Sequence, residues 1–269
     1  ATNGLPGRRM GRRGDESVVR AKSGIQNELN PGCTMQNPRS PTACVLIIGN
    51  EILSGRTQDA NLGYIGRRCD ALGIRLTEAR VIADDEAAII AHINECRARF
   101  TYVFTTGGIG PTHDDITSAT MAKAFGVALC RNPDAVAAME RYYEPGRLNE
   151  ARLRMADVPA GVRLIDNPVS GAPGFQLENV FVLPGVPSIM QAMFEGIVDR
   201  LAGGPPILTE SITTSLLEGQ FAPRLADIQS QFPDVAIGSY PFFRHGALGT
   251  KIVLRATDPD RLRSALAAV

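Results

Sequence analysis

The sequence predicts an α/β protein, with a three-layer α/β/α domain built on a mostly parallel sheet and a small α+β domain after it. Apolar runs of strand length alternate with amphipathic helical stretches between residues 43 and 204. The first run, Ala43–Gly49, is apolar throughout, which is typical of a parallel strand that helices cover on both faces. Residues 203–206 (Gly-Gly-Pro-Pro) then indicate a linker, and residues 205–269 follow a strand-helix-strand-strand-helix order. We therefore expect folded domains at 43–204 and 205–269.

The composition is that of a soluble globular protein. Basic and acidic residues balance at 28 each, and 44% of the 269 residues are hydrophobic. No apolar run reaches the roughly 20 residues of a membrane-spanning helix, so we expect no membrane partner. The cysteines are widely spaced and form no CxxC motif, which favours reduced thiols and a cytoplasmic location. They are Cys33, Cys44, Cys69, Cys96 and Cys130.

The N-terminal segment, residues 1–42, is expected to be a disordered extension, because Gly, Pro, Arg, Asn and Ser alternate there without apolar periodicity. Residues 1–43 hold seven basic and three acidic side chains, so a basic arm that binds nucleic acid is the rival interpretation. The remaining residues are mildly acidic, and we expect no nucleic-acid partner for the folded part.

A helix follows the first strand, and one more strand-helix unit comes after it. A helix that begins near Asp59 and Asn61 is expected to end at Gly73. Residues 74–83 are expected to form a second strand, and Asp85 is expected to cap the helix after it.

A glycine-rich loop follows the next strand, which runs from Tyr102 through Thr106. Gly107, Gly108 and Gly110 permit positive φ and let a ligand approach main-chain N–H groups without meeting a Cβ, which suits a phosphate or carboxylate. The spacing fits neither the dinucleotide fingerprint nor the P-loop. The loop therefore predicts an anion site of another kind.

Asp114 and Asp115 follow this loop, just before a helical pattern that ends at Gly126. Acidic side chains at that place are common helix caps. Beside a phosphate site, however, two carboxylates also suit Mg²⁺, which binds one or two carboxylates, water and phosphate oxygens. We favour a divalent cation, held by Asp115 and Asp114 next to the phosphate.

Later loops are expected to reach the same edge of the sheet. A strand at residues 180–183 leads into Pro184 and Gly185, and Pro187 stands where a helix begins and a missing N–H costs nothing. In a parallel sheet the loops after different strands gather at the carboxyl edge, so these residues can surround one pocket with the glycine loop. Arg152 is either a phosphate ligand or a surface arginine paired with a carboxylate.

The C-terminal domain contains Gly246-Ala247-Leu248-Gly249, which has the spelling of the GXXG loop of RNA-binding KH domains. In those domains the loop joins two helices, whereas here it lies between two predicted strands. Residues 205–269 also carry six basic and six acidic groups. We therefore expect a hairpin turn.

The stretch GGIGPTHDDIT, residues 107–117, resembles the GGxGPTxDDxT signature of the competence/damage-inducible protein A (CinA) family, within the MoaB/Mog molybdopterin-binding superfamily. Asn50-Glu51-Ile52-Leu53 and Asn61 resemble the GDEL and DTN segments of this family, with Asn50 where aspartate is usual. The βαββα pattern at the C-terminus resembles its KH-like domain. The resemblance covers about residues 43–204.

These motifs define the expected site. Asp115 and Asp114 are the expected catalytic and metal-binding residues. The expected phosphate- or cofactor-binding residues are Gly107, Gly108, Gly110, Thr112, Thr117, Glu51, Ser54, Asn61, Pro184, Gly185 and Pro187. For Glu51, a ligand contact and a loop-closing hydrogen bond remain equal alternatives.

The resemblance implies three functions. The first is a divalent-metal-dependent nucleotide pyrophosphatase acting on ADP-ribose or FAD, since relatives and the similar domain of eukaryotic FAD synthases are linked to such hydrolysis. The second is molybdopterin binding and adenylation, which Asp114 disfavours because molybdopterin adenylyltransferases have arginine there. The third is a non-catalytic nucleotide- or pterin-binding module. The resemblance also implies a homo-oligomer.

Overall fold

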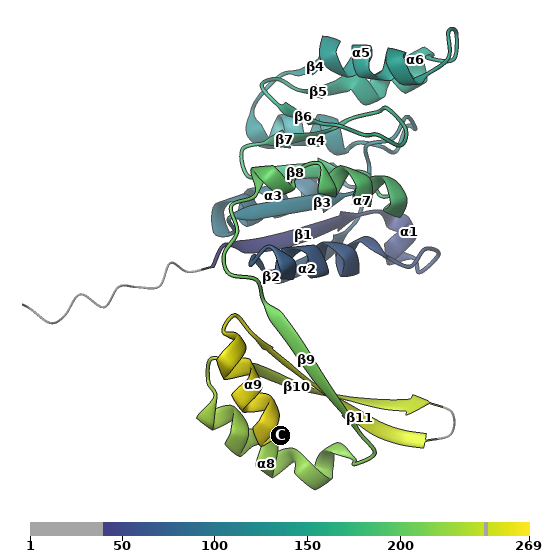
Figure 1. Ribbon diagram of the computed structural model, residues 1–269. Helices are drawn as coiled ribbons and strands as arrows, with labels where there is room; N and C mark the ends of the chain where they lie inside the picture. Colours follow the sequence, from purple (N-terminus) through teal and green to yellow (C-terminus); the bar gives the residue numbers. More distant parts are fainter. Residues whose placement is uncertain (1–39, 245–246) are drawn as a thin grey trace, which may run out of the picture. The chain divides into compact units, whose positions relative to one another are not determined.

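The computed structural model describes residues 40–244 and 247–269 (Figure 1). The first strand, β1, begins at Thr42. The N-terminal extension, residues 1–42, is expected to be disordered. Residues 1–39 of it lie outside the described part of the chain. The elements of the first domain are β1 (Thr42–Ile48), α1 (Asn50–Leu53), α2 (Asn61–Ala71), β2 (Arg75–Ile82), α3 (Glu86–Arg99), β3 (Tyr102–Thr106), α4 (Thr117–Phe125), β4 (Leu129–Arg131), α5 (Pro133–Tyr142), α6 (Glu150–Leu153), β5 (Asp157–Pro159), β6 (Arg163–Ile165), β7 (Gly174–Leu177), β8 (Val180–Leu183) and α7 (Pro187–Glu195).

The central sheet has six strands in the order β2-β1-β3-β8-β7-β6. The first four strands run parallel; β7 then pairs antiparallel to β8, and β6 pairs antiparallel to β7. This confirms the predicted, mostly parallel sheet. Because β1, β3 and β8 are parallel neighbours, the loops that follow them leave the sheet at one edge.

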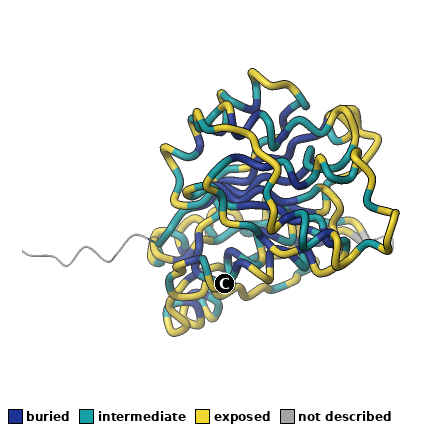
Figure 2. The backbone as a smooth tube through the Cα atoms, turned by 90° about the horizontal axis from the view of Figure 1, so that it is seen from above, coloured by how far each residue is buried: buried dark blue, intermediate teal, exposed yellow. Residues whose placement is uncertain are grey.

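Helices cover both faces of the sheet, because successive side chains of β1 point to opposite faces and are apolar on both. Ala43, Val45 and Ile47 pack in a cluster with residues of α2 and α7. Cys44, Leu46 and Ile48 point to the other face and pack with residues of α3 and α4. Buried residues accordingly concentrate along the strands and the helix faces turned toward them (Figure 2). The predicted three-layer arrangement is confirmed.

Two predicted helix ends are confirmed at atomic level. Asp85 is the N-cap of α3, and its Oδ1 accepts a hydrogen bond of 2.8 Å from the N–H of Ala88. Gly126 ends α4 in the left-handed conformation, with φ of 67°.

A small subdomain, formed by β4, β5, α5 and α6, inserts between α4 and β6 in the chain. It has a separate apolar cluster centred on Ala135, Met139 and Ala156. The short 3-10 helix Arg154–Ala156 closes it and leads back toward the sheet. The short strands β5, β6 and β7 were not expected from the sequence.

The C-terminal domain has the predicted βαββα order. Its elements are β9 (Leu208–Thr214), α8 (Glu218–Gln231), β10 (Ala236–Arg244), β11 (Ala247–Ala256) and α9 (Pro259–Ala268). The three strands form an antiparallel sheet in the order β10-β11-β9. Of the GXXG residues, Ala247, Leu248 and Gly249 belong to β11, which pairs antiparallel with β10, whereas Gly246 lies outside the described residues.

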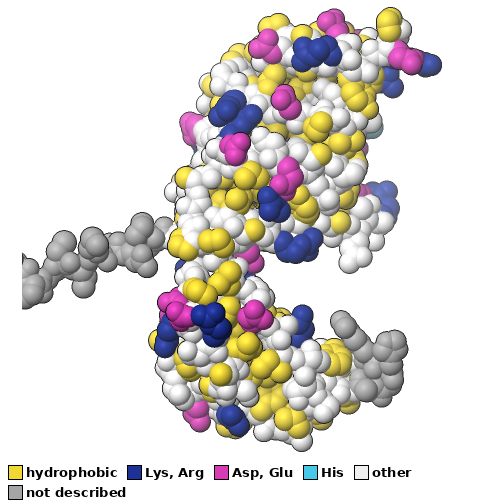
Figure 3. All heavy atoms as spheres, viewed as in Figure 1, with side chains coloured by type: hydrophobic (Ala, Val, Ile, Leu, Met, Phe, Trp, Pro, Cys, Tyr) yellow, Lys and Arg dark blue, Asp and Glu magenta, His cyan; other side chains and the backbone are white. Residues whose placement is uncertain are grey.

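Acidic and basic side chains are interspersed over the face of the described chain that Figure 3 presents. Among the described residues, no helix is long and apolar enough to cross a membrane.

Candidate functional site

The glycine loop lies between the ends of β1 and β8. The N–H of Gly107 donates to the carbonyl of Leu183 at 3.1 Å, which continues the pairing of β3 with β8. Gly107 has φ of 106°, and a Cβ there would lie 2.1 Å from the carbonyl oxygen of Ile48. Only glycine allows the chain to pass this close to β1.

Thr117, the first residue of α4, fastens the next part of the loop. Its N–H donates to the carbonyl of Gly108 at 3.0 Å, and its hydroxyl donates to the carbonyl of Gly107 at 3.2 Å. Gly108 has φ of 67°, and a Cβ there would lie 2.2 Å from the Thr117 hydroxyl. The buried Thr117 side chain therefore shapes the loop from within.

Three successive N–H groups of this loop remain available to a ligand. Those of Gly108, Ile109 and Gly110 donate no hydrogen bond within the part of the chain that the structure describes. Their residues are half-buried. Adjacent main-chain N–H groups in a glycine turn form a concave site for an anion.

Asp114 and Asp115 do not cap α4, so the capping interpretation is wrong. Ile116 occupies the N-cap position, and no side chain accepts a capping hydrogen bond there. Instead, Asp115 Oδ2 accepts from the Thr112 N–H at 2.8 Å and lies 2.5 Å from the Thr112 hydroxyl. A Cβ on Gly110 would meet this carboxylate at 2.6 Å, so the third glycine makes room for Asp115.

The two carboxylates converge on one hydroxyl. Asp114 Oδ1 lies 2.6 Å from Thr112 Oγ1, and Asp115 Oδ2 lies 2.5 Å from the same atom, so the two carboxylate oxygens are within about 5 Å of each other. A hydroxyl has one proton and can donate to only one of them at a time. The Thr112 hydroxyl also holds the pKa of Asp114 below its ordinary value, helped by the backbone N–H of Asp114 and by nearby His113. This pair offers hard oxygen ligands at an open surface.

Removing the hydroxyl is expected to raise the Asp114 pKa. In Thr112→Val, the largest cause of the lowered value is lost, so the Asp114 pKa should move toward that of an ordinary aspartate. The Asp114 pKa is lower in the folded protein than in the unfolded chain. The hydrogen bond from Thr112 to Asp114 therefore stabilises the fold at pH values above the ordinary aspartate pKa, and this stabilisation is lost as the pH falls through the lowered pKa. Carboxyl chemical shifts followed by NMR from pH 2 to 7 measure the change. An unaltered Asp114 titration would show that the hydroxyl does not hold the carboxylate.

A cavity of about 60 Å³ adjoins the loop at the same edge. Its lining includes predicted site residues that come from different elements, namely Glu51, Asn61, Gly185 and Pro187. Asn61 Nδ2 donates to the Gly185 carbonyl at 2.8 Å, which joins α2 to the loop after β8. The structure therefore brings these four residues together, although Asp114 and Asp115 lie outside the lining.

Two buried polar atoms beside this cavity lack a protein partner. Asn61 Oδ1 and Thr106 Oγ1 make no hydrogen bond to any described residue, although their residues are 3% and 1% exposed. Both residues line the cavity. A buried polar atom normally has a partner, so a polar ligand or an ordered water at this position is the physical explanation. Thr106 was not among the predicted site residues; its only signal was its place at the strand end.

The remaining predicted residues have local roles. The Ser54 hydroxyl donates to the Glu51 carbonyl at 3.2 Å and accepts from Arg56 at 3.0 Å. Pro184 is half-buried after β8 and does not line the cavity. Arg152 donates to the Arg147 carbonyl and stacks on the ring of Tyr143, and among the described residues it has no carboxylate partner.

Two charged residues near the loops were missed. The guanidinium of Arg154 donates to the Pro111 carbonyl at 2.7 Å and so brings a positive charge to the glycine loop. Asp84, directly after β2, accepts from the Asn50 N–H at 2.8 Å. Asn50 itself stands where an aspartate is usual in the resembled family, and Asp84 supplies a carboxylate at the start of the same segment. The spacing in the sequence could not show that Arg154 contacts Pro111 or that Asp84 contacts Asn50.

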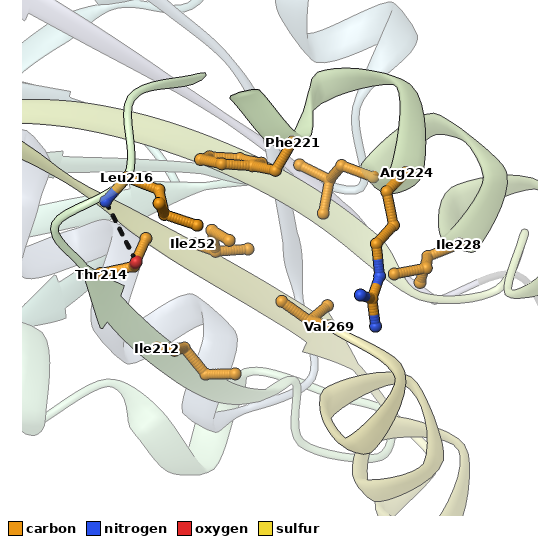
Figure 4. Close-up of a pocket in the computed structure, with 9 residues that line it drawn as sticks. Ile212, Thr214, Leu216, Phe221, Arg224, Ile228, Ile252 and Val269 are labelled. Carbon is orange, nitrogen blue, oxygen red and sulfur yellow. Dashed lines mark hydrogen bonds between the residues drawn. The ribbon is translucent and has the colours of Figure 1, made fainter. Parts of the chain in front are cut away.

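A second cavity, of about 170 Å³, lies within the C-terminal domain between α8, β9 and Val269 (Figure 4). Its lining is apolar except for Thr214 and Arg224, and Arg224 already donates to the carbonyl of Ala268 at 3.1 Å. This cavity lacks the convergent polar groups of the one at the carboxyl edge.

The fold and the loop are those of a molybdopterin-binding-type domain. Residues 44–203 match the family described as "Probable molybdopterin binding domain", and residues 206–269 match "FAD synthase, middle domain". The chain belongs to this molybdopterin-binding-domain family, in a form that continues into an FAD synthase middle domain. The resemblance to the N-terminal region of CinA proteins is also confirmed, by the similarities that follow.

Three similar proteins support this assignment. A protein of Pyrobaculum calidifontis is 36% identical over 212 residues, which cover 75% of this chain and 81% of the relative. A "Probable FAD synthase" of Caenorhabditis elegans is 29% identical over 88% of this chain, which spans only 50% of that relative's length. The solved structure of the protein CinA from Thermoplasma acidophilum, whose function is described as unknown, is 34% identical, with a TM-score of 0.56 over 60% of this chain and 98% of that one.

Proposed function

We propose that the protein is a divalent-metal-dependent nucleotide pyrophosphatase, acting on ADP-ribose- or FAD-type substrates at the carboxyl edge of the sheet. The observation that carries this proposal is the row of free N–H groups at Gly108, Ile109 and Gly110, next to the paired carboxylates of Asp114 and Asp115. Both features suit pyrophosphate chemistry, because the main-chain N–H groups can bind phosphate oxygens and the acidic side chains can hold a cation.

The carboxylate pair fits a hard cation. Its oxygens are within about 5 Å of each other, they are at least partly open to solvent, and Thr112 supplies only one proton to both. A bound cation of the Mg²⁺ type supplies Lewis acidity and lowers the pKa of a bound water. Asp115 and Asp114 would hold that cation, and the loop N–H groups would bind the phosphate oxygens.

The neighbouring cavity would orient the substrate. Asn61 Oδ1 can accept a hydrogen bond, and Thr106 Oγ1 can donate or accept one. Arg154, on Pro111, adds positive charge near the phosphate position. The similarity to a protein named as an FAD synthase supports FAD, or a related dinucleotide, as the substrate class.

Molybdopterin binding is the second candidate, and the family match over residues 44–203 favours it. A pterin ring carries several hydrogen-bond donors and acceptors, which suits the unpartnered atoms of Asn61 and Thr106. Adenylation of that ligand is disfavoured because Asp114 stands where the resembled molybdopterin adenylyltransferases have an arginine, which attracts nucleotide phosphates.

The proposal is tested by incubating the full chain with ADP-ribose, FAD or ATP and Mg²⁺, Mn²⁺ or Co²⁺. We expect release of mononucleotides, measured by chromatography, from ADP-ribose or FAD with at least one cation and none with a chelator. Tight molybdopterin binding without hydrolysis of any nucleotide would support the second candidate. Nucleotide binding by calorimetry without product would indicate a non-catalytic module.

Asn61→Ala is expected to weaken ligand binding. Loss of one hydrogen bond to a buried polar group costs about 1–3 kcal/mol, which corresponds to an increase in Kd of roughly 5- to 150-fold. Calorimetry with ADP-ribose or FAD measures it. Asn94→Ala is the matched control, because Asn94 Oδ1 is also buried without a partner but lies on α3, outside the cavity. Equal affinities in both variants would exclude Asn61 from the site.

A further inference from the structure

A second group of ligating side chains lies away from the carboxyl edge. Cys44 on β1, Glu78 on β2 and Cys96 on α3 place their ligand atoms within 4.8 Å of one another. Within residues 40–244 and 247–269, this is the one such group of three or more His, Cys, Asp or Glu side chains. Cys44 stands near the beginning of β1, whereas the candidate site lies beyond its end at Ile48.

The separation of the sulfur atoms matches tetrahedral zinc coordination. The two Sγ atoms are 3.7 Å apart. Two thiolates bound to one zinc ion, with Zn–S bonds of about 2.3 Å at the tetrahedral angle, lie about 3.8 Å apart. The thiols therefore need almost no rearrangement to share one ion.

The fold holds the three side chains in place independently of any ion. Cys44 and Glu78 are register partners on adjacent parallel strands, so both side chains point to the face that α3 covers. Cys96 and Cys44 are fully buried in the apolar cluster of that face. The Glu78 side chain is 27% exposed at the edge strand β2, which gives an ion a path inward.

Two arginines orient the carboxylate. Arg80 Nε donates to Glu78 Oε1 at 2.5 Å, and Arg99 donates to Glu78 Oε2 at 3.1 Å. Carboxylates that bind metals are commonly held by such hydrogen bonds. The two arginines also balance charge. With both thiols deprotonated, the two thiolates and the carboxylate carry one more negative charge than a divalent ion neutralises, and the positive guanidinium groups offset it.

We propose that Cys44, Cys96 and Glu78 form a binding site for one zinc-type divalent cation. Two thiolates with one carboxylate select zinc or cobalt over the magnesium class, which prefers oxygen alone. Binding forms two metal–sulfur bonds and one metal–oxygen bond and releases the two thiol protons to solvent. Water or the second Glu78 oxygen completes the tetrahedron. The ion joins β1, β2 and α3, and so stabilises the sheet edge.

Cobalt titration tests the proposal, because Co²⁺ bound to thiolates absorbs strongly through sulfur-to-metal charge transfer. The parent protein carries Cys33→Ser and Cys130→Ser, which leaves Cys44, Cys69 and Cys96 as its cysteines. We expect one Co²⁺ per chain with this absorption, its displacement by Zn²⁺, and a higher Tm with Zn²⁺ present. An ion held by Asp114 and Asp115 has no sulfur ligand and gives no such band, so failure of the proposed function leaves this result unaffected.

Single variants then assign the ligands. Cys44→Ser and Cys96→Ser should each abolish the band, whereas Cys69→Ser should retain it, because Cys69 is equally buried but packs on the opposite face of the sheet. Glu78→Gln, at a partly exposed position, should keep the band with roughly 10- to 100-fold weaker binding. Circular dichroism confirms folding of each variant. Absence of the band in the parent, a band that survives in folded Cys44→Ser or Cys96→Ser, or unchanged binding in Glu78→Gln would overturn the proposal.

Discussion

Asp115→Asn is expected to lower the rate of nucleotide pyrophosphate hydrolysis by about 100-fold or more, equivalent to roughly 2.7 kcal/mol of transition-state stabilisation. Asparagine retains an oxygen that can accept the Thr112 N–H, now at 2.8 Å from Asp115, so the loop should keep its shape. It removes the negative charge that would hold the cation. The loss should therefore appear in kcat/KM and in the metal concentration needed for half-maximal rate.

Asp134→Asn is the matched control for this prediction. Asp134 is an exposed carboxylate in the first turn of α5, in the small subdomain, and the substitution removes the same charge. Its hydrolysis rate should equal that of the unaltered protein. If Asp115→Asn and Asp134→Asn have the same rate and need the same metal concentration for half-maximal rate, Asp115 is not the cation ligand of the reaction.

Gly107→Ala is expected to destabilise the fold by about 3 kcal/mol or more, and to abolish ligand binding at the loop. Two costs add at this position. The φ of 106° is strained for alanine, and the new Cβ would lie 2.1 Å from the Ile48 carbonyl oxygen, a backbone atom of the central strand. Relief of this clash requires β1 and β3 to separate, or the loop to leave the sheet edge.

Gly126→Ala separates the two costs. Gly126 also has positive φ, at 67°, but a Cβ there would meet nothing within 4 Å, so only the conformational cost of about 1–2 kcal/mol applies. Urea unfolding of both variants measures the difference. Equal destabilisation of the two proteins would mean that the close approach of the loop to β1 does not constrain residue 107.

The long elements of the fold could be predicted from the sequence because their patterns are local. Continuous apolar runs predicted β1 and β8. The helix ends at Asp85 and Gly126 were predictable because a capping side chain or a glycine with positive φ acts on backbone groups only a few residues away. Strands β5 and β6 have three residues each, too few to show a period of two, and they depend on pairing with another strand.

The candidate site was predictable where its residues are close in sequence, or where they follow parallel strands whose loops meet at one edge of the sheet. Gly107 and Gly108 were identified by their spacing, and both have positive φ in the structure. Arg154 and Asp84 could not be assigned to the site, because their partners lie 43 and 34 residues away. The capping interpretation of Asp115 failed for a local reason, since the carboxylate turns back to Thr112 instead of forward to α4.

The free N–H groups of the glycine loop have an evolutionary consequence. Contacts made by the main chain do not depend on side-chain identity, so Ile109 and the almost fully exposed His113 can mutate without removing them. The glycines at 107 and 108 cannot, because neighbouring atoms occupy the space that any larger residue needs. Divergence among relatives should therefore spare the backbone shape of this turn while it alters the residues around it, and with them the choice of substrate.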